Sequence, residues 1–403
     1  MDTPLKPKII AAKITKDAER HLISGHPWIY SKSILKLGKE GRAGDICIIY
    51  SQQKNEMMAI GLYDPSSPIR IKVLDLGKNI HLDMDYWLHK VQVALEKRYP
   101  LLETDTNAFR LIFGENDGLP GIILDVYDRI GVIKIYSEIW FSHFSLLLSS
   151  IIQIISLDSI VLRLSRTLDK SDLLPKGWYN GLTIYGTLKG ETVTFKEYGL
   201  LFRTSVIKGH KTGFFLDHRH NRKKVGELSR GKKVLDVFSY AGGFSVHALA
   251  GGADEVTSLD ISAQAQSMAK INVLLNNQSA RHKIIVGDAF KEMQKMIDNH
   301  EKFDLVIIDP PSFAAKESQV KGALASYRSL VHLGSKLVAS MGILVMASCS
   351  SRVESNVFYS LVEDGLEKSG KWVCIDKTGH DIDHPVGFPE GEYLKCGFYV
   401  NNQ

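Results

Sequence analysis

The sequence is poor in cysteine, and its few cysteines do not form a recognisable metal or disulfide pattern. Among 403 residues there are only Cys47, Cys349, Cys374 and Cys396. No two have C-x-x-C spacing, and no His/Cys group has the spacing of a zinc site. Sparse cysteine of this kind is typical of reducing compartments. We therefore expect reduced thiols, no metal site and a cytoplasmic location.

Long apolar runs are also missing. Residues 1–6 contain no apolar signal core, and the most apolar stretch, residues 144–157, is too short and too rich in serine to span a bilayer. A membrane partner is therefore not expected. The formal net charge of +5 is mildly basic, which permits a nucleic-acid partner without requiring one.

Two nucleotide-binding fingerprints are absent as well. No P-loop G-x-x-x-x-G-K-[ST] occurs, which argues against a phosphate-splitting enzyme of that class. No G-x-G-x-x-G accompanies the glycine turn described below, so a nicotinamide nucleotide is the weaker prediction.

The chain is long enough for two or three domains, and its patterns change along the sequence. Residues 8–76 hold short runs of strand formers, residues 83–99 an amphipathic helical period, and residues 109–190 a mixture of both. A hairpin is expected at 192–204. We predict a small β-barrel domain at 1–80, an α+β domain with a linker helix at 81–190, and a third domain at 191–403.

The third domain alternates strictly between strand and helix. Strands are expected at 234–238, 255–260, 283–286, 303–309 and 342–347, and helices at 244–250, 263–276, 290–298 and 326–339. This alternation predicts a Rossmann-like α/β fold with a mostly parallel, doubly wound sheet.

Acidic residues mark the ends of its first three strands. Asp236 lies in the first strand, just before a small-residue turn, and Asp260 and Asp288 end the next two. Ligands of such sheets bind at the carboxyl ends of the strands, where glycine lets the backbone approach closely. A carboxylate there suits the two hydroxyl donors of a ribose. Each acid taken alone can also be explained as a helix cap, so only the three acids together favour a ligand site.

The fourth and fifth strands end in the residues that carry reaction chemistry. The fourth ends in Asp309-Pro310-Pro311, where two prolines stiffen the corner, and the fifth is followed by Cys349. A cysteine is needed when the methyl acceptor is carbon 5 of a pyrimidine, because thiolate addition at carbon 6 makes carbon 5 nucleophilic. Packing is the alternative role for Cys349. It is the expected role of the other three cysteines.

These motifs resemble one family, the bacterial ribosomal RNA large-subunit cytosine-5 methyltransferases with an N-terminal PUA domain. Asp309-Pro310-Pro311 is similar to motif IV of class I methyltransferases. The other segments that carry the resemblance are Gly25-His26-Pro27-Trp28-Ile29-Tyr30, Glu115-Asn116-Asp117-Gly118-Leu119-Pro120-Gly121, Lys211-Thr212-Gly213-Phe214-Phe215-Leu216-Asp217, Asp383-His384-Pro385 and Pro389-Glu390-Gly391-Glu392-Tyr393-Leu394-Lys395. The resemblance covers nearly the whole chain.

The resemblance implies S-adenosylmethionine as cofactor and Cys349 as nucleophile. It implies that Asp309 holds a target cytosine that has been flipped out of its RNA. The predicted cofactor-binding residues are Phe214, Asp217, Arg219, Asp236, Phe238, Ser239, Tyr240, Gly242, Gly243, Asp260, Ile261, Asp288, Ala289, Asp309 and Pro310. The implied partner is RNA of the large ribosomal subunit, protein-poor or partly assembled, and family members can dimerise.

Two histidines depart from the family pattern. The family has Gln and Asp one and three residues after the aspartate that corresponds to Asp217, whereas this chain has His218 and His220. We expect both to be partly exposed polar contacts without a catalytic role. Ser312 stands where related RNA enzymes often carry a second cysteine, so Cys349 would act alone.

Two alternative functions stay open. One is a methyltransferase acting on a ring or exocyclic nitrogen, such as a guanine position, which needs no thiol. The other is a catalytically inert RNA-binding scaffold. Candidate phosphate contacts are Lys13, Lys16, Arg20, Lys208, Lys211, Arg219, Arg222, Lys223 and Lys224. The cluster Arg219–Lys224 is the favoured one.

Overall fold

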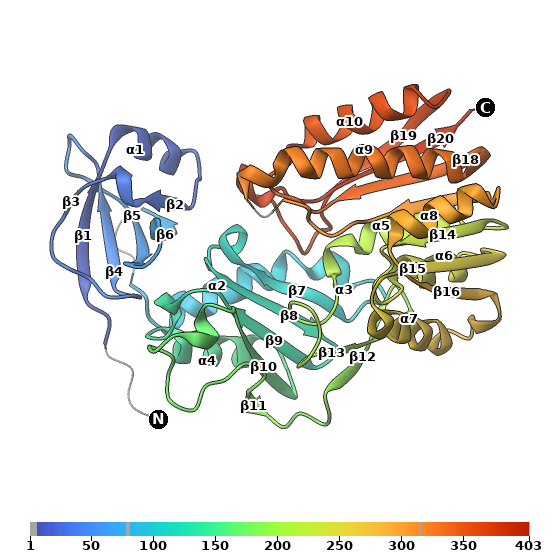
Figure 1. Cartoon of the computed structure of the whole chain (residues 1–403). Helices are drawn as coiled ribbons and strands as arrows, with labels where there is room; N and C mark the ends of the chain where they lie inside the picture. Colours follow the sequence, from blue (N-terminus) through green and yellow to red (C-terminus); the bar gives the residue numbers. More distant parts are fainter. Residues whose placement is uncertain (1–5, 78–80, 315, 403) are drawn as a thin grey trace. The chain divides into compact units, whose positions relative to one another are not determined.

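The computed structural model describes residues 6–77, 81–314 and 316–402, which form two compact units (Figure 1). The first unit comprises residues 1–193, 205–214 and 382–389, and the second comprises residues 194–204, 215–381 and 390–403. The predicted domains 1–80 and 81–190 thus fall within one unit. No helix in the described ranges is long and apolar enough to cross a membrane.

The first unit begins with a six-stranded sheet and one helix. Its strand order is β2-β6-β5-β4-β1-β3. The elements are β1 (Ile9–Ile14), α1 (Lys16–Ile23), β2 (Trp28–Tyr30), β3 (Ile34–Leu37), β4 (Ile46–Tyr50), β5 (Met57–Tyr63) and β6 (Ile69–Leu76). Thr15 caps α1 by accepting a hydrogen bond from the backbone N–H of Ala18. Alternate residues of β1 and β4 are buried, as expected for strands with one covered face.

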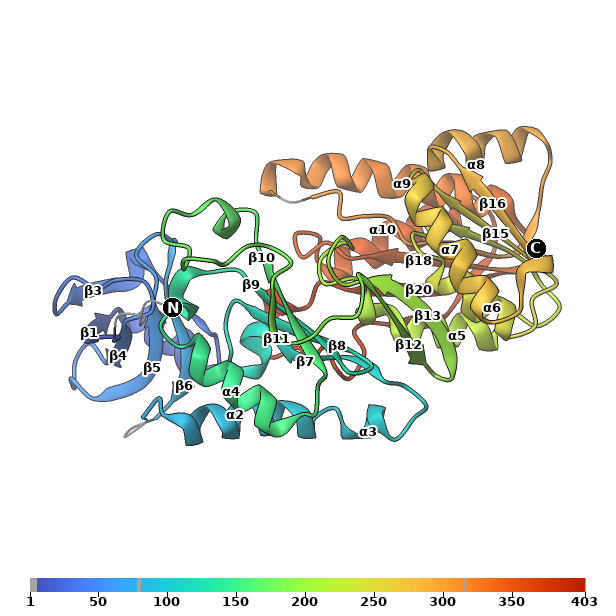
Figure 2. The ribbon, with the colours of Figure 1, turned by 90° about the horizontal axis from the view of Figure 1, so that it is seen from below.

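A second, five-stranded sheet completes the first unit, in the order β11-β10-β9-β8-β7. Its elements are α2 (Met84–Glu96), α3 (Tyr99–Leu102), β7 (Ala108–Phe113), β8 (Ile122–Tyr127), β9 (Ile130–Ile135), α4 (Phe144–Ile154), β10 (Ser159–Leu164) and β11 (Thr183–Gly186). Helices α2 and α4 lie side by side on one face of this sheet (Figure 2). Trp87 and Trp140 are fully buried in the core beneath them.

The second unit contains a seven-stranded sheet in the order β16-β15-β14-β17-β18-β20-β19. Its strands are β14 (Lys233–Val237), β15 (Glu255–Asp260), β16 (His282–Val286), β17 (Phe303–Ile308), β18 (Val338–Ser348), β19 (Trp372–Thr378) and β20 (Lys395–Asn401). The first five are parallel, and β20 runs antiparallel to both of its neighbours. The strand order reverses between β14 and β17, which is where doubly wound sheets bind ligands.

Helices cover both faces of this sheet. Helices α8 (Ala289–Asp298), α9 (Val320–Leu337) and α10 (Ser355–Glu367) pack in one layer, and α5 (Arg219–Glu227), α6 (Gly243–Ala250) and α7 (Ala263–Leu275) pack in the other. The hairpin β12 (Thr192–Glu197) and β13 (Leu200–Ser205) is held by α7. The side-chain amide of Asn272 accepts from the Arg203 N–H at 2.8 Å, and that of Asn276 bonds both backbone groups of Leu201.

The predicted doubly wound sheet is confirmed, with strand ends within a few residues of those expected from the sequence. Cys374 lies in β19 and Cys396 in β20, and Cys47 and Cys396 are buried, as the packing role expected for them requires. The packing role expected for Cys374 is wrong, because its side chain is exposed in the outermost strand, β19.

Candidate functional site

The turn after β14 is tight, and several of its residues have backbone angles that are unfavourable for residues other than glycine. Phe238, Tyr240 and Gly242 all have positive φ, at 63°, 46° and 76°. A Cβ added to Gly242 would lie 2.9 Å from the Cβ of Ala269 on α7. The turn therefore needs glycine at this position, and it brings backbone close to the carboxyl ends of β14 and β15 just before α6 begins.

Asp236 provides a buried carboxyl directly below this turn. Its Oδ2 accepts from the backbone N–H of Ser245 at 3.0 Å and from the Ser245 hydroxyl at 2.6 Å. Its Oδ1 is buried and accepts no hydrogen bond from the described residues. Burial, with help from the nearby charges of Asp309 and Asp260, raises the pKa of Asp236 to about 7. An unsatisfied buried acceptor of this kind fits a bound donor group.

Asp260 and Asp288 stand at the ends of the next two strands, as the sequence predicts. The Asp260 carboxylate accepts from the backbone N–H of Tyr240 at 2.9 Å and of Ser262 at 2.8 Å, which ties it to the turn. Because a carboxylate has about four acceptor positions, it can still accept from a ribose diol. Ile261 follows with 72% of its surface exposed, a flat apolar contact suited to a purine ring. Asp288 caps α8, just before Ala289, through the Lys291 N–H.

Ser239 has a partner that the sequence did not reveal. Gln266 on α7 is buried and donates from Nε2 to the Ser239 hydroxyl at 2.8 Å, while its Oε1 accepts no hydrogen bond from the described residues. The amide thus holds the turn and keeps a second buried acceptor beside it. No motif marked Gln266, because its role depends on the packing of α7 against the turn.

Asp309 lies at the corner after β17 and is paired with a histidine. Its carboxylate Oδ1 lies 3.3 Å from Nε2 of His218, and its backbone N–H donates to the Val237 carbonyl at 3.3 Å. His218 is buried, so the expectation that it is partly exposed is wrong. Burial disfavours the charged imidazole, but the carboxylates of Asp309 and Asp217 outweigh that cost, and the pKa of His218 is raised.

A short chain of hydrogen bonds fixes the orientation of that histidine. The Thr378 hydroxyl donates to Oδ1 of Asn221, which leaves the Asn221 amide nitrogen to donate to Nδ1 of His218 at 3.1 Å. When the imidazole is neutral, Nδ1 acts as the acceptor, and the ring proton stands on Nε2 and faces Asp309. His218 therefore faces Oδ1 of Asp309 as an ion-pair partner, although the contact lacks the geometry of a hydrogen bond, and Oδ2 is left for another ligand.

Cys349 follows β18 beside the Asp309-Pro310 corner. Its Sγ lies 3.7 Å from the Pro310 carbonyl oxygen, and its side chain is partly exposed. Lys395, the first residue of β20, is buried and donates from Nζ to the Ser350 carbonyl at 2.7 Å. Burial lowers the pKa of Lys395 to about 8, against the opposite pull of Glu392 and Cys349. A cation next to a cysteine favours its thiolate.

Three of the predicted cofactor-binding residues make contacts within the protein that bear on their predicted role. Phe214 belongs to the first unit, where its backbone N–H donates a hydrogen bond to the Tyr127 hydroxyl at 3.0 Å. Asp217 is buried, and its Oδ2 accepts from the Tyr393 hydroxyl at 2.7 Å. Arg219 is fully buried and ion-paired with Asp381 at 2.8 Å, so contact with a phosphate is ruled out for it.

The favoured RNA-binding cluster Arg219–Lys224 is largely wrong for the same reason. Arg222 is also buried, and its guanidinium makes two hydrogen bonds to the carboxylate of Glu197, at 2.7 and 2.6 Å. Lys224 is ion-paired with Asp376, which leaves Lys223 as the exposed cation of this helix. The sequence suggested exposed cations here because Glu197, the acid that neutralises Arg222, lies 25 residues before it in the sequence.

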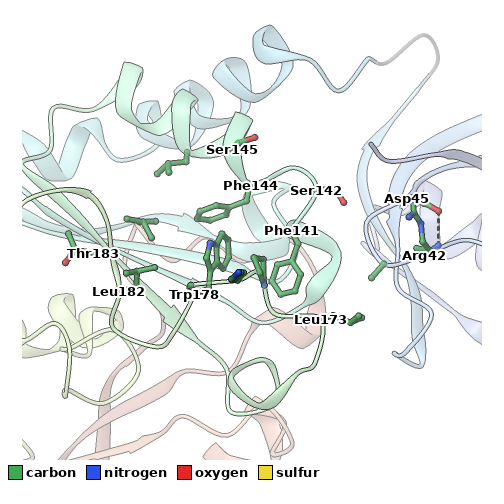
Figure 3. A pocket seen from close by; sticks show the side chains of 16 residues that line it. Arg42, Asp45, Phe141, Ser142, Phe144, Ser145, Leu173, Trp178, Leu182 and Thr183 are labelled. Carbon is green, nitrogen blue, oxygen red and sulfur yellow. Dashed lines mark hydrogen bonds between the residues drawn. The ribbon is translucent and has the colours of Figure 1, made fainter. Parts of the chain in front are cut away.

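A separate cavity of about 680 Å³ lies in the first unit (Figure 3). Its wall is mainly apolar, and the ring of Trp178 makes edge-to-face contacts with the rings of Phe141 and Phe144. Asp45, at its margin, is occupied by the backbone N–H groups of Lys8 and Arg42. None of the predicted catalytic or cofactor residues lines this cavity.

Comparison with family models identifies two parts of the chain. Residues 12–76 match the model of a PUA-like domain, and residues 182–365 match that of S-adenosylmethionine-dependent methyltransferases. The ribosomal RNA large subunit methyltransferase of Deinococcus radiodurans is 41% identical, over 96% of both chains. Ribosomal RNA large subunit methyltransferase I of Aeromonas salmonicida is 34% identical, over 95% of this chain and 97% of that protein.

Solved structures share the fold. A candidate S-adenosylmethionine-dependent methyltransferase from Streptococcus mutans superposes with a TM-score of 0.82 at 21% identity, covering 97% of this chain and 99% of that one. A candidate methyltransferase complexed with SAH superposes with a TM-score of 0.83, also at 21% identity, covering 98% of this chain and 100% of that one. With a PUA-like domain, a class I sheet and full-length relatives, the chain belongs to the ribosomal RNA large subunit methyltransferase family of S-adenosylmethionine-dependent enzymes.

Proposed function

We propose that this enzyme methylates carbon 5 of a cytosine in large-subunit ribosomal RNA, with Cys349 as nucleophile. The observation that carries the proposal is the position of Cys349, whose Sγ lies 3.7 Å from the Pro310 carbonyl and therefore next to Asp309. The names of the relatives support ribosomal RNA as the substrate.

The cofactor residues are proposed to be those around the turn after β14. The unsatisfied Oδ1 of Asp236, the acceptor positions of Asp260 and the exposed Ile261 fit the amino, ribose and purine groups of S-adenosylmethionine. The close backbone at Gly242 fits a ligand seated against the turn. When bound, the cofactor supplies an electrophilic methyl group on a sulfonium.

The chain's own residues would then activate the base. The Cys349 thiolate would add to carbon 6, which gives carbon 5 the electron density to accept a methyl group. Transfer of the carbon 5 proton to water would then re-form the carbon 5–carbon 6 double bond and expel the thiolate. The Lys395 ammonium stabilises the thiolate electrostatically. Asp309, whose Oδ1 faces His218, would present Oδ2 as an acceptor to the amine of the cytosine, beside the ring nitrogen.

The test is to identify the methylated nucleoside. Wild type, Cys349→Ala and the control Cys374→Ala, which changes an exposed cysteine in β19, are incubated with labelled S-adenosylmethionine and unmodified large-subunit RNA. The RNA is digested and its nucleosides are separated by mass spectrometry. We expect 5-methylcytidine from wild type and Cys374→Ala, and a loss of at least about a thousandfold in rate for Cys349→Ala.

A second candidate, methylation of a nitrogen, predicts the opposite pattern. An enzyme of that kind needs no thiol, so Cys349→Ala would remain active and a different nucleoside would carry the label. Cofactor binding by Cys349→Ala, measured by calorimetry, shows whether a loss of activity reflects chemistry or misfolding.

A further inference from the structure

A continuous series of hydrogen-bonded side chains, here called the hydrogen-bond chain, runs from the carboxyl of Asp236 to the beginning of β16. Oδ2 of Asp236 accepts from the Ser245 hydroxyl at 2.6 Å. The Ser245 hydroxyl oxygen lies 2.6 Å from that of Ser258, which in turn lies 2.7 Å from Nε2 of His282. Side chains from α6 and from the neighbouring strands β14, β15 and β16 are thus connected without a gap (Figure 1).

The two ends of the hydrogen-bond chain differ in exposure. Asp236, Ser245 and Ser258 are completely buried. His282 is partly exposed, and it is the first residue of β16, an edge strand of the sheet. Ser258 occupies a position in a covered parallel strand where an apolar side chain is usual, and it is paired with Asp236 across β14 and β15. The hydrogen-bond chain therefore links a buried acid to a partly exposed imidazole.

The hydroxyl protons can be ordered in only two ways, because each serine has one proton to donate. When Asp236 is ionised, both serine hydroxyls point toward it, and a neutral His282 donates from Nε2. When Asp236 carries a proton on Oδ2, the order reverses, and Nε2 of His282 becomes an acceptor with the ring proton on Nδ1. The protonation of Asp236 and the tautomer of His282 are therefore coupled.

The surroundings of the two ends favour a proton on the acid and a neutral imidazole. Burial, with the carboxylates of Asp309 and Asp260, raises the pKa of Asp236 to about 7. Burial and the charge of Lys270 on α7 lower the pKa of His282 to about 4. Because this imidazole does not retain an extra proton near neutral pH, it can take one at Nε2 and release one from Nδ1.

We propose that the hydrogen-bond chain is a proton path, along which Asp236 loses its proton when its unpartnered Oδ1 binds the cationic amino group of the cofactor. The O–H bond of Asp236 breaks as Ser245 takes the proton, and each serine passes its own proton to the next group. His282 receives a proton at Nε2 and gives the one on Nδ1 to water. Only Asp236 ends with one proton fewer. The inference rests on the proposed cofactor site and not on the chemistry at Cys349.

The tautomer of His282 tests the path directly. In the full-length protein with ¹⁵N-labelled histidine, correlation NMR distinguishes the Nδ1–H and Nε2–H tautomers, and His282→Gln identifies the signals of this residue. Without cofactor we expect the Nδ1–H form at about pH 6 and the Nε2–H form at about pH 8, because the switch follows the pKa of Asp236. Addition of S-adenosylmethionine at the lower pH should produce the Nε2–H form.

Cofactor binding gives a second measurement. At about pH 6 roughly nine-tenths of Asp236 is protonated, so calorimetry should show S-adenosylmethionine binding about tenfold more weakly than at about pH 8. Heats measured in two buffers of different ionisation enthalpy should show the release of about 0.9 proton per cofactor bound at the lower pH. Binding without proton release would overturn the proposal.

Two variants interrupt the path at different points. Ser258→Ala breaks it at the centre, and Ser245→Ala breaks it beside the acid while keeping the backbone N–H bond to the carboxylate. In both variants His282 should keep one tautomer at either pH and with cofactor bound. Ser229→Ala is the matched control, because Ser229 is equally buried but its hydroxyl bonds a backbone carbonyl of α5, and it should switch like wild type. A switch that persists in both path variants would overturn the proposal.

These outcomes are independent of the methylation test. A tautomer that switches with pH but not with S-adenosylmethionine would overturn the proposal and remove Asp236 from the cofactor site, while the role of Cys349 would be unaffected. If wild type forms no 5-methylcytidine, but His282 switches on cofactor binding and the path variants do not, the proposed chemistry is wrong and the path stands.

Discussion

At the scale of single residues, the feature that most distinguishes this chain is the histidine beside Asp309. The resembled family has glutamine at the position of His218. A glutamine amide can donate a hydrogen bond, but unlike an imidazole it does not become protonated and positively charged. Here the imidazole is buried, oriented by Asn221, and 3.3 Å from the carboxylate. The departure therefore adds a charge that depends on pH without removing the hydrogen-bond donor.

His218→Gln should make the stability of the enzyme less dependent on pH. Because Asp309 and Asp217 raise the pKa of His218 in the folded state, the imidazolium stabilises the fold fully below the unfolded pKa of about 6.5. That contribution is lost as the pH rises through the folded pKa. We expect the variant to lose about 1–3 kcal/mol of unfolding free energy at acidic pH and much less at alkaline pH.

Urea unfolding at several pH values checks this, with His220→Gln as the control because His220 is exposed on the same helix. Methylation should survive the change to glutamine. Equal destabilisation at acidic and alkaline pH would mean that His218 acts by packing alone.

At the scale of secondary-structure elements, the sequence predicts what lies at the carboxyl ends of parallel strands and misses what crosses the sheet. Asp260, Asp309 and Cys349 were found because parallel strands bring their ends to one edge. Lys395 was missed because β20 inserts antiparallel between β18 and β19, pairing Lys395 with Ser348 from a distant part of the chain. No local sequence pattern predicts such a pairing.

Buried ion pairs were missed for a related reason. Arg219 and Arg222 lie in a helix so rich in cations that its sequence looks solvated, yet Glu197 in β12 neutralises them inside the core. Burial alone would raise the pKa of Glu197, but Arg222 and His247 lower it well below its usual range. The partners in such buried ion pairs are determined by tertiary packing, which cannot be predicted from the sequence of either element alone.

Asn272 on α7 connects two elements, and its loss should be felt at the cofactor turn. Its amide nitrogen donates to the Ala241 carbonyl at 2.9 Å, and its oxygen accepts from the Arg203 N–H at 2.8 Å. Asn272→Ala leaves the buried Ala241 carbonyl and the part-buried Arg203 N–H without these partners, which costs about 1–3 kcal/mol for the buried group. We expect calorimetry to show S-adenosylmethionine binding weakened about tenfold.

Asn276→Ala is the matched control, because Asn276 bonds β13 from one helical turn further on. Its side chain pairs with both backbone groups of Leu201 but with no residue of the turn. It should lower stability while leaving cofactor affinity near that of wild type. Equal losses of affinity in the two variants would show that α7 acts through the hairpin and not through Ala241.

At the scale of the whole molecule, the chain returns to its first unit near its end. Residues 382–389 belong to the first unit, although they follow most of the second. Asp383 is buried there, accepts from the Arg110 N–H at 2.8 Å through Oδ2, and receives the Arg98 guanidinium on its carbonyl at 3.1 Å. The first unit therefore cannot complete its hydrogen bonds until nearly the whole chain has been made.

Asp383→Ala should loosen the first unit selectively. The substitution leaves the Arg110 N–H, in strand β7, buried without its acceptor, at a cost of about 1–3 kcal/mol. We expect hydrogen exchange followed by mass spectrometry to show faster exchange of the β7 amides and unchanged exchange in β14. Glu390→Gln, an exposed change in the adjoining segment of the second unit, should alter neither strand. If β14 exchanged faster as well, the two units would share one unfolding transition, and the returning segment would stabilise the whole chain rather than its first unit.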